Sequence, residues 1–377
     1  MIRVLHIVGG LGRGGLETFI MNVYRNIDRS IIQFDFLKTS PDEGAYEEEI
    51  KDLGGRIYSI QPRRNGILNY RKELNKFFEK HKEYKIVHQH VSSLSDINAL
   101  KIAKKNGVPI RIIHSHSTSQ GSRNSLLKIF HYFLHNVNQK RITTIANDFF
   151  ACSEVAAEWI LGRKLYERKD FKIIYNGIEA EFFKFDKKVR DIVRNEFNVE
   201  NDEILIGNVG RFHQSKNHEF LIDIFHYLVK VRPKAKLLLV GDGKLRNHIE
   251  NKVKTLGLDQ NVIFTGIRKD VSRILQGMDL FLMPSLYEGF PVSVIEAQCA
   301  GLPCLLSDTI TKETQITDLV KYESLNSSPE IWANKILDMI RSFERADTTD
   351  LIKEAGFDAK MIAEDLTKYY LRRVQMM

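Results

Sequence analysis

Short apolar runs alternate with longer amphipathic segments along almost the whole chain, and this alternation limits the possible folds more than any other feature. The runs end in Gly, Ser, His or Asn, which is typical of buried parallel strands joined by helices. In the first half we expect strands at 4–8, 34–37, 57–60, 86–90, 110–114, 149–152 and 172–175. In the second half we expect strands at 204–209, 237–240, 262–265, 280–283 and 303–306. The sequence therefore predicts an α/β protein with two Rossmann-like domains.

The chain length agrees with two domains. With 377 residues, of which 43% are hydrophobic, the chain is long enough for two separate cores. We place the boundary soon after Asn176 and Gly177, with the first domain at 1–180 and the second at 181–356. Ligands of open parallel sheets bind beyond the carboxyl ends of the strands. Two such domains therefore predict a binding site in a cleft across which they face each other.

Composition indicates a reducing compartment. The three cysteines, Cys152, Cys299 and Cys304, are too scattered for a disulfide framework or a metal cluster. The apolar run at 4–8 is short and leads into a glycine turn, so it reads as a strand and not as a secretory signal. No segment approaches 18 uncharged apolar residues. We expect a cytoplasmic protein without a membrane span and without a nucleic-acid partner.

The excess positive charge is concentrated in one stretch. The net charge is +8, and residues 97–147 contain eight Lys or Arg and no Asp or Glu. Within this stretch, residues 126–135 carry apolar side chains at helical spacing beside cations, as interfacial helices do, although a helix packed on the core would look similar. An anionic inner membrane leaflet would attract such a surface. The cations assigned to this membrane or acceptor face are Arg123, Lys128, Lys140 and Arg141.

Two glutamates, Glu288 and Glu296, lie eight residues apart across an expected strand-to-helix junction. Pro291 has a fixed φ that suits the first position of a helix, so a helix should start near it. The first amides of that helix, from about Val292, would then point towards an anion. One glutamate can reach the far end of a ligand and the other a polar group beside it, although an isolated pair of glutamates is more often solvated.

A glycine-rich loop follows the first expected strand. It fits G-x-G-x-x-G at Gly10, Gly12 and Gly15, and Asp35 lies about twenty residues further on. An NAD-linked oxidoreductase is therefore one possible interpretation. The same glycines would also allow a close approach of the backbone to any phosphate or sugar.

Two cations, Arg211 and Lys216, flank the loop after the first strand of the second half. Arg can hold a diphosphate through its planar fork and Lys as a point charge. Ser215 or Asn217 could cap the helix that follows. Surface cations without a binding function are the alternative, because Arg and Lys are mostly exposed, but the position of both at a strand end favours an anion site.

Two H-x-H pairs, 88–90 and 114–116, lie at neighbouring strand ends. The period-two spacing of a strand puts both histidines of a pair on the same face. A metal-dependent hydrolase is therefore a second alternative. The carboxylate ligands that such sites usually add are missing near both pairs, which argues against it.

Taken together and in this order, the motifs resemble the retaining nucleotide-sugar glycosyltransferases of family four, which have the GT-B fold. The resemblance extends over about residues 5–313. It is carried by the motifs at 14–17, 116, 176–178, 210–211, 216–217, 240–243, 264–266 and 288–296. In family members the final helix usually returns to the first domain, and residues 357–377 would do so here. The first domain would then bind the acceptor and the second the nucleotide sugar.

The resemblance also implies roles for single residues. The implied catalytic residues are His116, Arg211, Lys216 and Glu288. The implied donor-binding residues are Gly14, Gly15, Gly210, Arg211, Lys216, Gly241, Gly266, Glu288, Gly289, Phe290, Pro291, Val292 and Glu296. In this interpretation the two cations hold the diphosphate. Glu296 binds the ribose, Glu288 contacts the donor sugar, and His116 lies near the reacting carbon.

The expected chemistry agrees with these roles. Transfer from a nucleotide diphosphate must stabilise negative charge on the leaving phosphate, by a metal ion or by fixed donors. The sequence has no evident metal cluster near 288–296, so we expect a metal-independent enzyme without a cofactor, and the resemblance implies that it is retaining. The resemblance favours UDP as the nucleotide. A catalytically silent protein that binds sugar nucleotides or lipids stays open as a further alternative.

The segment at 307–313 departs from the family, because it lacks the glycine that members often have there. In this it resembles the branch that builds capsular and exopolysaccharides. The expected acceptor is a lipid-linked or soluble glycan, and the expected location is the cytoplasmic face of the cell membrane.

Overall fold

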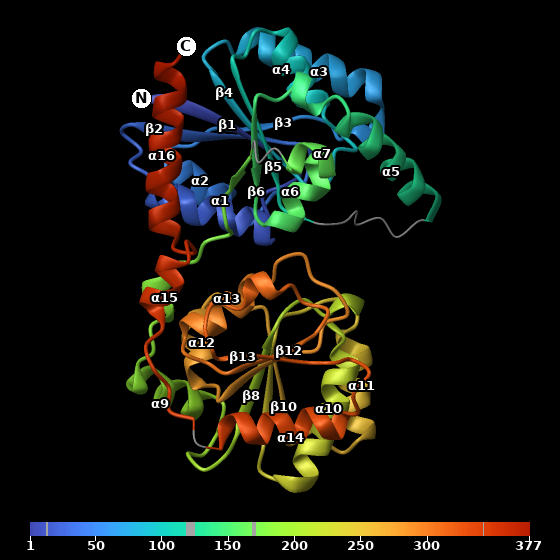
Figure 1. Ribbon diagram of the computed structural model, residues 1–377, viewed down its shortest axis with the longest axis vertical. Helices are drawn as coiled ribbons and strands as arrows, with labels where there is room; N and C mark the ends of the chain where they lie inside the picture. Colours follow the sequence, from blue (N-terminus) through green and yellow to red (C-terminus); the bar gives the residue numbers. More distant parts are fainter. Residues whose placement is uncertain (13, 118–124, 168–170, 342) are drawn as a thin grey trace. The chain divides into compact units, whose positions relative to one another are not determined.

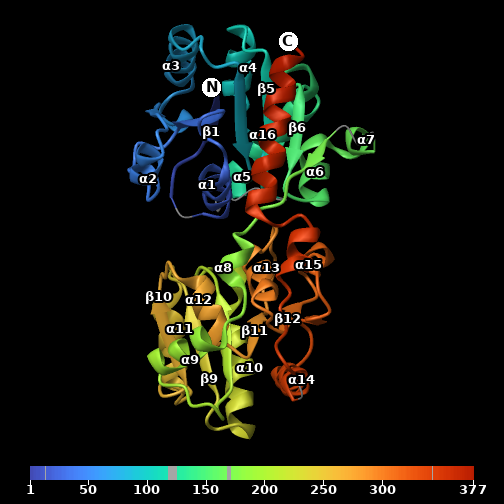
Figure 2. The same cartoon turned by 90° about the vertical axis from the view of Figure 1, so that its left-hand side faces the viewer.

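The computed structural model describes residues 1–12, 14–117, 125–167, 171–341 and 343–377 (Figure 1). Within these residues the chain forms two compact units. The first unit consists of Met1–Gly177 and Ala359–Met377, and the second of Ile178–Asp358. Each unit is a parallel sheet with helices on its faces, as the two views in Figures 1 and 2 show. The predicted fold class, α/β with two Rossmann-like domains, is therefore confirmed.

The first unit contains a seven-stranded parallel sheet in the order β3-β2-β1-β4-β5-β6-β7. Its strands are β1 (Ile2–Val8), β2 (Ile32–Lys38), β3 (Ile57–Ser59), β4 (Ile86–Val91), β5 (Ile110–Ser115), β6 (Asp148–Ala151) and β7 (Lys172–Ile173). Its α-helices are α1 (Gly15–Asn26), α2 (Glu47–Asp52), α3 (Ile67–Lys80), α4 (Asn98–Lys105), α5 (Ser125–Gln139), α6 (Glu154–Leu161), α7 (Arg163–Tyr166) and α16 (Ala359–Gln375). The short 3-10 helices are η1 (Arg63–Asn65) and η2 (Ile142–Thr144).

The second unit contains a six-stranded parallel sheet in the order β10-β9-β8-β11-β12-β13. Its strands are β8 (Leu205–Val209), β9 (Lys236–Val240), β10 (Val262–Gly266), β11 (Leu280–Met283), β12 (Cys304–Ser307) and β13 (Val320–Glu323). Its α-helices are α8 (Ala180–Phe183), α9 (Lys187–Glu196), α10 (His218–Val231), α11 (Arg246–Thr255), α12 (Val271–Gly277), α13 (Val292–Cys299), α14 (Pro329–Ile340) and α15 (Thr349–Glu354). The short 3-10 helices are η3 (Gln214–Lys216) and η4 (Lys312–Thr314).

The central strands are apolar because helices cover both faces of each sheet. All four residues of β11 are fully buried, as expected for a strand in the middle of a doubly covered parallel sheet. All twelve predicted strands are present, with ends that differ by a few residues. The strand β13 was not predicted. Its sequence, Val-Lys-Tyr-Glu, is short and mostly polar because it lies at the sheet edge.

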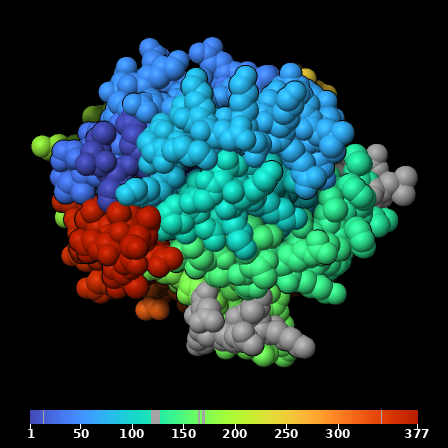
Figure 3. Space-filling model, turned by 90° about the horizontal axis from the view of Figure 1, so that it is seen from above, coloured from blue at the N-terminus to red at the C-terminus, as the bar shows by residue number. Residues whose placement is uncertain are grey.

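The C-terminal helix α16 is part of the first unit, where it packs against α1. Figure 3 shows α16, in red, on the surface beside the N-terminal residues in dark blue. Its inner face, which includes Ile362, Leu366 and Tyr370, is buried in the core of this unit. The Tyr370 hydroxyl forms a hydrogen bond of 2.8 Å with His88 Nδ1 of β4. The sheet of the first unit therefore depends on a segment from the far end of the chain.

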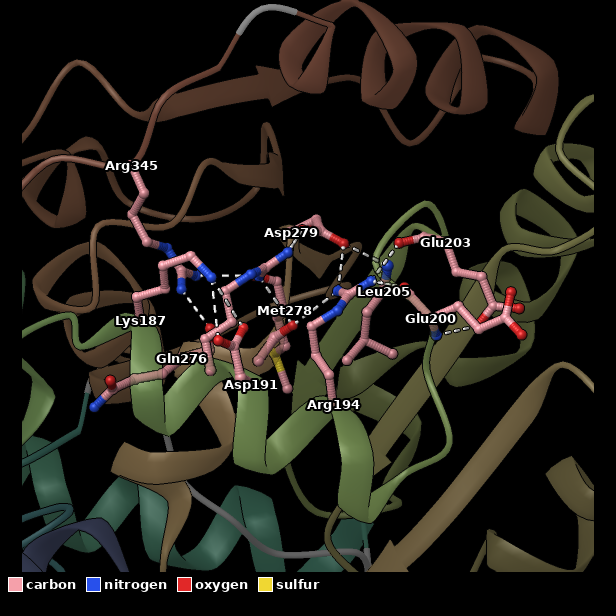
Figure 4. A network of polar contacts seen from close by, with 12 residues as sticks. Lys187, Asp191, Arg194, Glu200, Glu203, Leu205, Gln276, Met278, Asp279 and Arg345 are labelled. Carbon is pink, nitrogen blue, oxygen red and sulfur yellow. Dashed lines mark hydrogen bonds and ion pairs between the residues drawn. The ribbon is translucent and has the colours of Figure 1, made fainter.

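A network of polar contacts anchors the start of β8 and β11 in the second unit (Figure 4). Asp279 accepts hydrogen bonds from Arg190 Nη2 at 2.6 Å, from Arg194 Nη1 at 3.1 Å and from the Leu205 amide at 2.7 Å. Arg345 donates to the carbonyl groups of Gln276 and Met278, and burial lowers the pKa of its guanidinium to about 9. The network fixes the two strands whose opposite, carboxyl ends carry the candidate site.

Candidate functional site

The candidate site of the second unit lies at the carboxyl ends of β8 and β11. These strands are neighbours in the sheet, and the strand order reverses between them. Open parallel sheets bind ligands at such a reversal. Arg211 and Lys216 follow β8, while Glu288 follows β11 and α13 begins at Val292. The sheet topology therefore brings together residues that are more than seventy positions apart in the sequence.

The loops after β8 and β11 are joined by an ion pair and a backbone hydrogen bond. Lys216 Nζ lies 2.8 Å from Glu288 Oε1, and the side chains are 17% and 11% exposed. The Leu286 amide donates to the Ser215 carbonyl at 2.7 Å. The Ser285 hydroxyl also donates to Glu288 Oε1, at 2.6 Å. The carboxylate of Glu288 therefore holds the Lys216 ammonium in a defined position.

Hydroxyl groups from the end of β12 support this arrangement, and the sequence did not reveal them. Ser307 Oγ and Thr309 Oγ1 both donate to the Ser285 carbonyl, at 2.6 and 2.8 Å. They therefore fix the turn that carries Glu288. The only signal in the sequence is a serine at or near the end of each of two neighbouring apolar strands, Ser285 and Ser307. Ser307 and Thr309 belong to the segment at 307–313 that departs from the family pattern.

Arg211 extends from the same edge of the sheet and is exposed. Within the described part of the chain, its guanidinium has no ion-pair partner, so the charge is available to a ligand. The preceding Gly210 lies under the Lys216 side chain, because a Cβ atom at this position would stand 3.3 Å from Lys216 Cε. Gly210 therefore gives the lysine room to lie across the loop.

Two of the predicted donor-site glycines have a structural explanation without a ligand. Gly241 has a φ of +138°, and a Cβ atom there would stand 2.1 Å from the Gly210 carbonyl oxygen. Its amide donates to the carbonyl of Gly266, which has a φ of +70°. Both glycines are thus needed to bring together the loops after β8, β9 and β10. In contrast, a Cβ atom at Gly289 would meet no other atom within 4 Å, so the backbone there is open to a ligand.

Helix α13 carries Glu296 and begins one residue later than expected. Pro291 has φ −77° and ψ 96°, so it precedes the helix in an extended conformation and is not the first helical residue. The proline ring fixes φ but leaves ψ free, which explains the difference. Val292 is the first residue of the helix. The ring of Phe290 stacks on Phe357, with centroids 5.5 Å apart, so this side chain contributes to packing.

Glu296 is partly buried, and removal of its carboxyl group from water raises its pKa to about 7. Among the residues that the structure describes, no side chain or backbone group forms a hydrogen bond or ion pair with this carboxyl. A carboxylate that is desolvated and unpaired is costly unless a ligand supplies hydrogen-bond donors. Glu296 therefore has the properties of a residue that binds a hydroxyl group.

The glycine loop of the first unit leads into α1, with Gly14 at the N-cap and Gly15 as the first helical residue. Arg13 lies outside the described residues. A Cβ atom at Gly12 or Gly15 would meet nothing within 4 Å, so the backbone there is open. The dinucleotide interpretation also needs a carboxylate that is free to bind a ribose, and Asp35 is not free. It is fully buried, pairs with Arg3 and accepts a hydrogen bond from Tyr84.

His116 follows β5 and joins a network of histidines in the first unit. Its Nε2 lies 2.8 Å from His90 Nδ1, and its Nδ1 lies 3.3 Å from the side-chain oxygen of Asn176. Burial lowers the pKa of His116 to about 3, so the ring is neutral at physiological pH. The two H-x-H pairs lie side by side, because His90 pairs with His114 in the strand register.

Helix α5 shows an unexpected distribution of side chains. The exposed apolar residues are Leu127, Ile129, Phe130, Tyr132 and Phe133, each between 51% and 66% exposed. The buried positions are polar: His135 accepts a hydrogen bond from the Leu94 amide, and Asn138 donates one to the Leu94 carbonyl. These five apolar side chains of the helix therefore do not face the core.

The predicted cations of this face are only partly described. Arg123 lies outside the described residues, whereas Lys128, Lys140 and Arg141 are exposed. Within the part of the chain that the structure describes, no helix is both long enough and apolar enough to cross a membrane.

Comparison with known sequences matches two glycosyltransferase families. The family described as glycosyl transferases group 1 matches residues 189–355, and the one described as glycosyltransferase family 4 matches residues 13–182. The chain is 33% identical to "Putative glycosyltransferase EpsF" of Bacillus subtilis, over 98% of this chain and 96% of that protein. It is 27% identical to the capsular polysaccharide biosynthesis glycosyltransferase CapH of Staphylococcus aureus, over 99% of both chains.

Two further proteins are informative. The chain is 29% identical to the UDP-Gal:alpha-D-GlcNAc-diphosphoundecaprenol alpha-1,3-galactosyltransferase of Escherichia coli, over 81% of this chain and 78% of that enzyme. Its fold is similar to the crystal structure of Anabaena Alr3699/HepE in complex with UDP-glucose, with a TM-score of 0.73. That comparison covers 99% of this chain and 100% of the other, at 18% sequence identity.

Proposed function

The chain belongs to family 4 of the glycosyltransferases, the glycosyl transferases group 1, and on this premise we propose that it is a retaining, metal-independent enzyme that uses a UDP-sugar. Family membership gives the GT-B fold and the reaction class. It replaces the alternatives of a metal-dependent hydrolase and an NAD-linked oxidoreductase. The donor, the acceptor and the roles of single residues are the subject of the proposal.

One observation carries the proposal most strongly, namely the ion pair of Lys216 and Glu288 beside the exposed Arg211. The two cations lie at the sheet edge where ligands of parallel folds bind. A diphosphate that leaves the sugar gains negative charge in the transition state. Fixed cations that stabilise this charge can contribute several kcal/mol, in place of a metal ion. We assign this function to Arg211 and Lys216.

We propose that Glu296 binds the ribose of the nucleotide. Its carboxyl group is desolvated and has no partner among the described residues, and two ribose hydroxyl groups would supply the missing donors. We propose that Glu288 contacts the donor sugar and also holds Lys216 in position. UDP as the nucleotide is supported by the UDP-Gal of the Escherichia coli relative's name and by the UDP-glucose in the HepE structure.

The proposed mechanism needs no second catalytic carboxylate. In a retaining transfer, the acceptor hydroxyl attacks from the face that the diphosphate leaves, so the departing phosphate can take its proton. We propose that His116 contacts the donor sugar near the reacting carbon. Because its ring is neutral at physiological pH, it would act by hydrogen bonding and not as an acid.

We propose a lipid-linked glycan as the acceptor, on the cytoplasmic face of the cell membrane. The exposed apolar side chains of α5, beside Lys128, Lys140 and Arg141, form a surface that suits an anionic bilayer. The diphosphoundecaprenol in the Escherichia coli relative's name supports a polyprenyl-linked acceptor. The name of CapH supports a place in capsular polysaccharide synthesis.

The experiment that tests the proposal follows UDP release from a panel of nucleotide sugars, with and without EDTA. We expect turnover that EDTA does not reduce, and a loss of about 10²-fold or more in Arg211→Ala and Lys216→Ala. Arg232→Ala and Lys230→Ala, at the opposite end of α10, are matched controls and should keep wild-type rates.

Three results would contradict the proposal. Activity that EDTA abolishes and Mn²⁺ restores would show that a metal ion stabilises the leaving group. UDP binding without turnover on any donor would favour a silent sugar-nucleotide-binding protein. Wild-type turnover in a folded His116→Ala variant would remove His116 from the reacting centre.

A further inference from the structure

Five histidines lie close together in the first unit and form two hydrogen-bonded groups. His6 Nδ1 lies 2.9 Å from His90 Nε2, and His90 Nδ1 lies 2.8 Å from His116 Nε2. In the second group, His88 Nε2 lies 3.2 Å from His114 Nδ1. The strand register explains the proximity, because His6 pairs with His88 and His90 with His114. The proposed transfer reaction uses only one of these rings.

Three of the rings have the geometry of a metal site. His90, His114 and His116 each offer one ring nitrogen, and these atoms all lie within 4.8 Å of one another. Three nitrogens bound to one Zn²⁺ lie roughly 3.3 Å apart, given Zn–N bonds of roughly 2.0–2.1 Å at tetrahedral angles. The three nitrogens could therefore reach the spacing of a Zn²⁺ site through side-chain shifts well below the length of an imidazole ring. His116 is partly exposed, which gives an ion access from solvent.

Groups that would orient these three rings are also present. Ligating histidines usually form a hydrogen bond through their other ring nitrogen, which fixes the ring. His116 does so with the Asn176 side-chain oxygen, His90 with His6, and His114 with His88. His114 Nε2 is buried and has no hydrogen-bond partner among the described residues. All three rings are thus already held by groups outside the triad.

We propose that His90, His114 and His116 bind a Zn²⁺-type ion, and that the bound ion inhibits the enzyme. A site of three neutral imidazoles without a carboxylate favours Zn²⁺, Co²⁺ or Cu²⁺ over Mg²⁺ and Ca²⁺, which prefer oxygen ligands.

The inhibitory effect rests on the proposed function. If His116 contacts the donor sugar, a metal ion bound to its ring would occupy the ring nitrogen that faces His90 and His114. The ion would also add a positive charge beside the reacting carbon. The positive charge on an oxocarbenium-like sugar would then be destabilised. The same chain would therefore need no metal for catalysis and would lose activity when a metal binds.

The site itself is tested by titrating the full-length protein, first cleared of metal with a chelator, with Co²⁺. We expect the visible absorption of tetrahedral Co²⁺ to saturate at about one equivalent, and Zn²⁺ but not Mg²⁺ to remove it. His116→Ala and His90→Gln should lose the band, whereas the exposed His248→Gln control should keep it. Near-UV circular dichroism checks that each variant is folded. His116 is partly exposed, so His116→Ala serves if the buried His90→Gln variant does not fold.

The inhibition is tested separately by UDP release in the presence of Zn²⁺. We expect a loss of about tenfold or more at stoichiometric Zn²⁺, reversed by EDTA. No cobalt band, or an equal band in folded His116→Ala, would overturn the site. A band without inhibition would overturn the inhibitory role. A protein inactive on every donor would contradict the proposed function alone, and the cobalt titration would still decide the site.

Discussion

The 2.8 Å contact between Lys216 and Glu288 makes two residues with different assigned roles depend on each other. Removing either side chain leaves a mostly buried charge without its partner. The effects of Lys216→Ala and Glu288→Ala on turnover should therefore not add. In a double-mutant cycle we expect a coupling of about 1–3 kcal/mol. Glu288→Gln should lose less than Glu288→Ala, because the amide keeps an oxygen for Lys216 and Ser285.

The readout that separates the two roles is UDP affinity. If Glu288 only holds the cation, the UDP dissociation constant should rise in Glu288→Ala as it does in Lys216→Ala. If Glu288 also contacts the sugar, turnover should fall further than UDP affinity, since that contact is made during transfer. Fully additive effects on turnover would contradict the coupling.

The elevated pKa of Glu296 makes stability depend on pH in a defined window. Its pKa is raised from 4.5 to about 7, so between these values the folded protein holds a proton that the unfolded chain releases. The free energy of unfolding should therefore fall as the pH rises from 4.5 to 7, by on the order of 2 kcal/mol from this group. Glu296→Gln should lack this loss, whereas its UDP affinity should be lower than that of the wild type.

The measurement is urea unfolding of the wild type and Glu296→Gln at several pH values. Other carboxyl groups also titrate, so the difference between the two proteins isolates Glu296. A pH-independent difference would show that Glu296 ionises like an exposed glutamate.

Among the secondary-structure elements, those with strong apolar runs could be predicted from the sequence and those set by sheet position could not. The buried strand β11 is apolar throughout and was recognised at its exact bounds, whereas the polar edge strand β13 was missed. The start of α13 differed by one residue because proline determines φ and the following turn determines ψ. The periodicity of a single segment shows neither whether a strand lies at the sheet edge nor which ψ a proline before a helix adopts.

The candidate site was predictable in the same partial way. Single residues such as Arg211 and Lys216 could be found from their place after a strand. The contact of Lys216 with Glu288 could not, because it depends on the adjacency of β8 and β11. Similarly, the sequence does not show the packing reasons for Gly241 and Gly266, which are the close approach of the Gly210 carbonyl to Gly241 and the positive φ of Gly266.

Helix α5 shows that an amphipathic pattern alone does not reveal which side faces inwards. Because Phe130 and Phe133 are exposed, Phe130→Ser/Phe133→Ser should change the stability by no more than about 0.5 kcal/mol. Transfer of each ring into a bilayer is worth about 1.5–3 kcal/mol, so binding to anionic liposomes should fall by about tenfold or more. Ile267→Ser, at an exposed position in the second unit, is the matched control and should bind as the wild type does.

Sedimentation with anionic and neutral liposomes measures this difference. Salt should weaken the binding, and Lys128→Glu/Arg141→Glu should reduce it for anionic liposomes only. Equal binding of all variants, without an effect of salt, would make α5 an ordinary surface and a soluble glycan the better acceptor.

At the level of the complete molecule, the two units differ in which parts of the chain form them. The second unit is one continuous segment, Ile178–Asp358, while the first needs both ends of the chain. The core of the first unit includes Leu366 and the fully buried Tyr370 of α16. Removal of this helix would leave a large cavity beside β4 and would also leave His88 without its hydroxyl partner.

This difference predicts the behaviour of two fragments. The residues assigned to the diphosphate and the ribose, Arg211, Lys216 and Glu296, lie in the continuous second unit. Residues 178–358 alone should therefore unfold cooperatively and bind UDP within about tenfold of the full-length affinity, and Lys216→Ala in the fragment should weaken that binding. Residues 1–177 should not fold alone, but should fold when a linker adds residues 359–377. Calorimetric UDP titration and thermal unfolding measure both. A folded 178–358 fragment that does not bind UDP would show that the nucleotide site needs residues of the first unit.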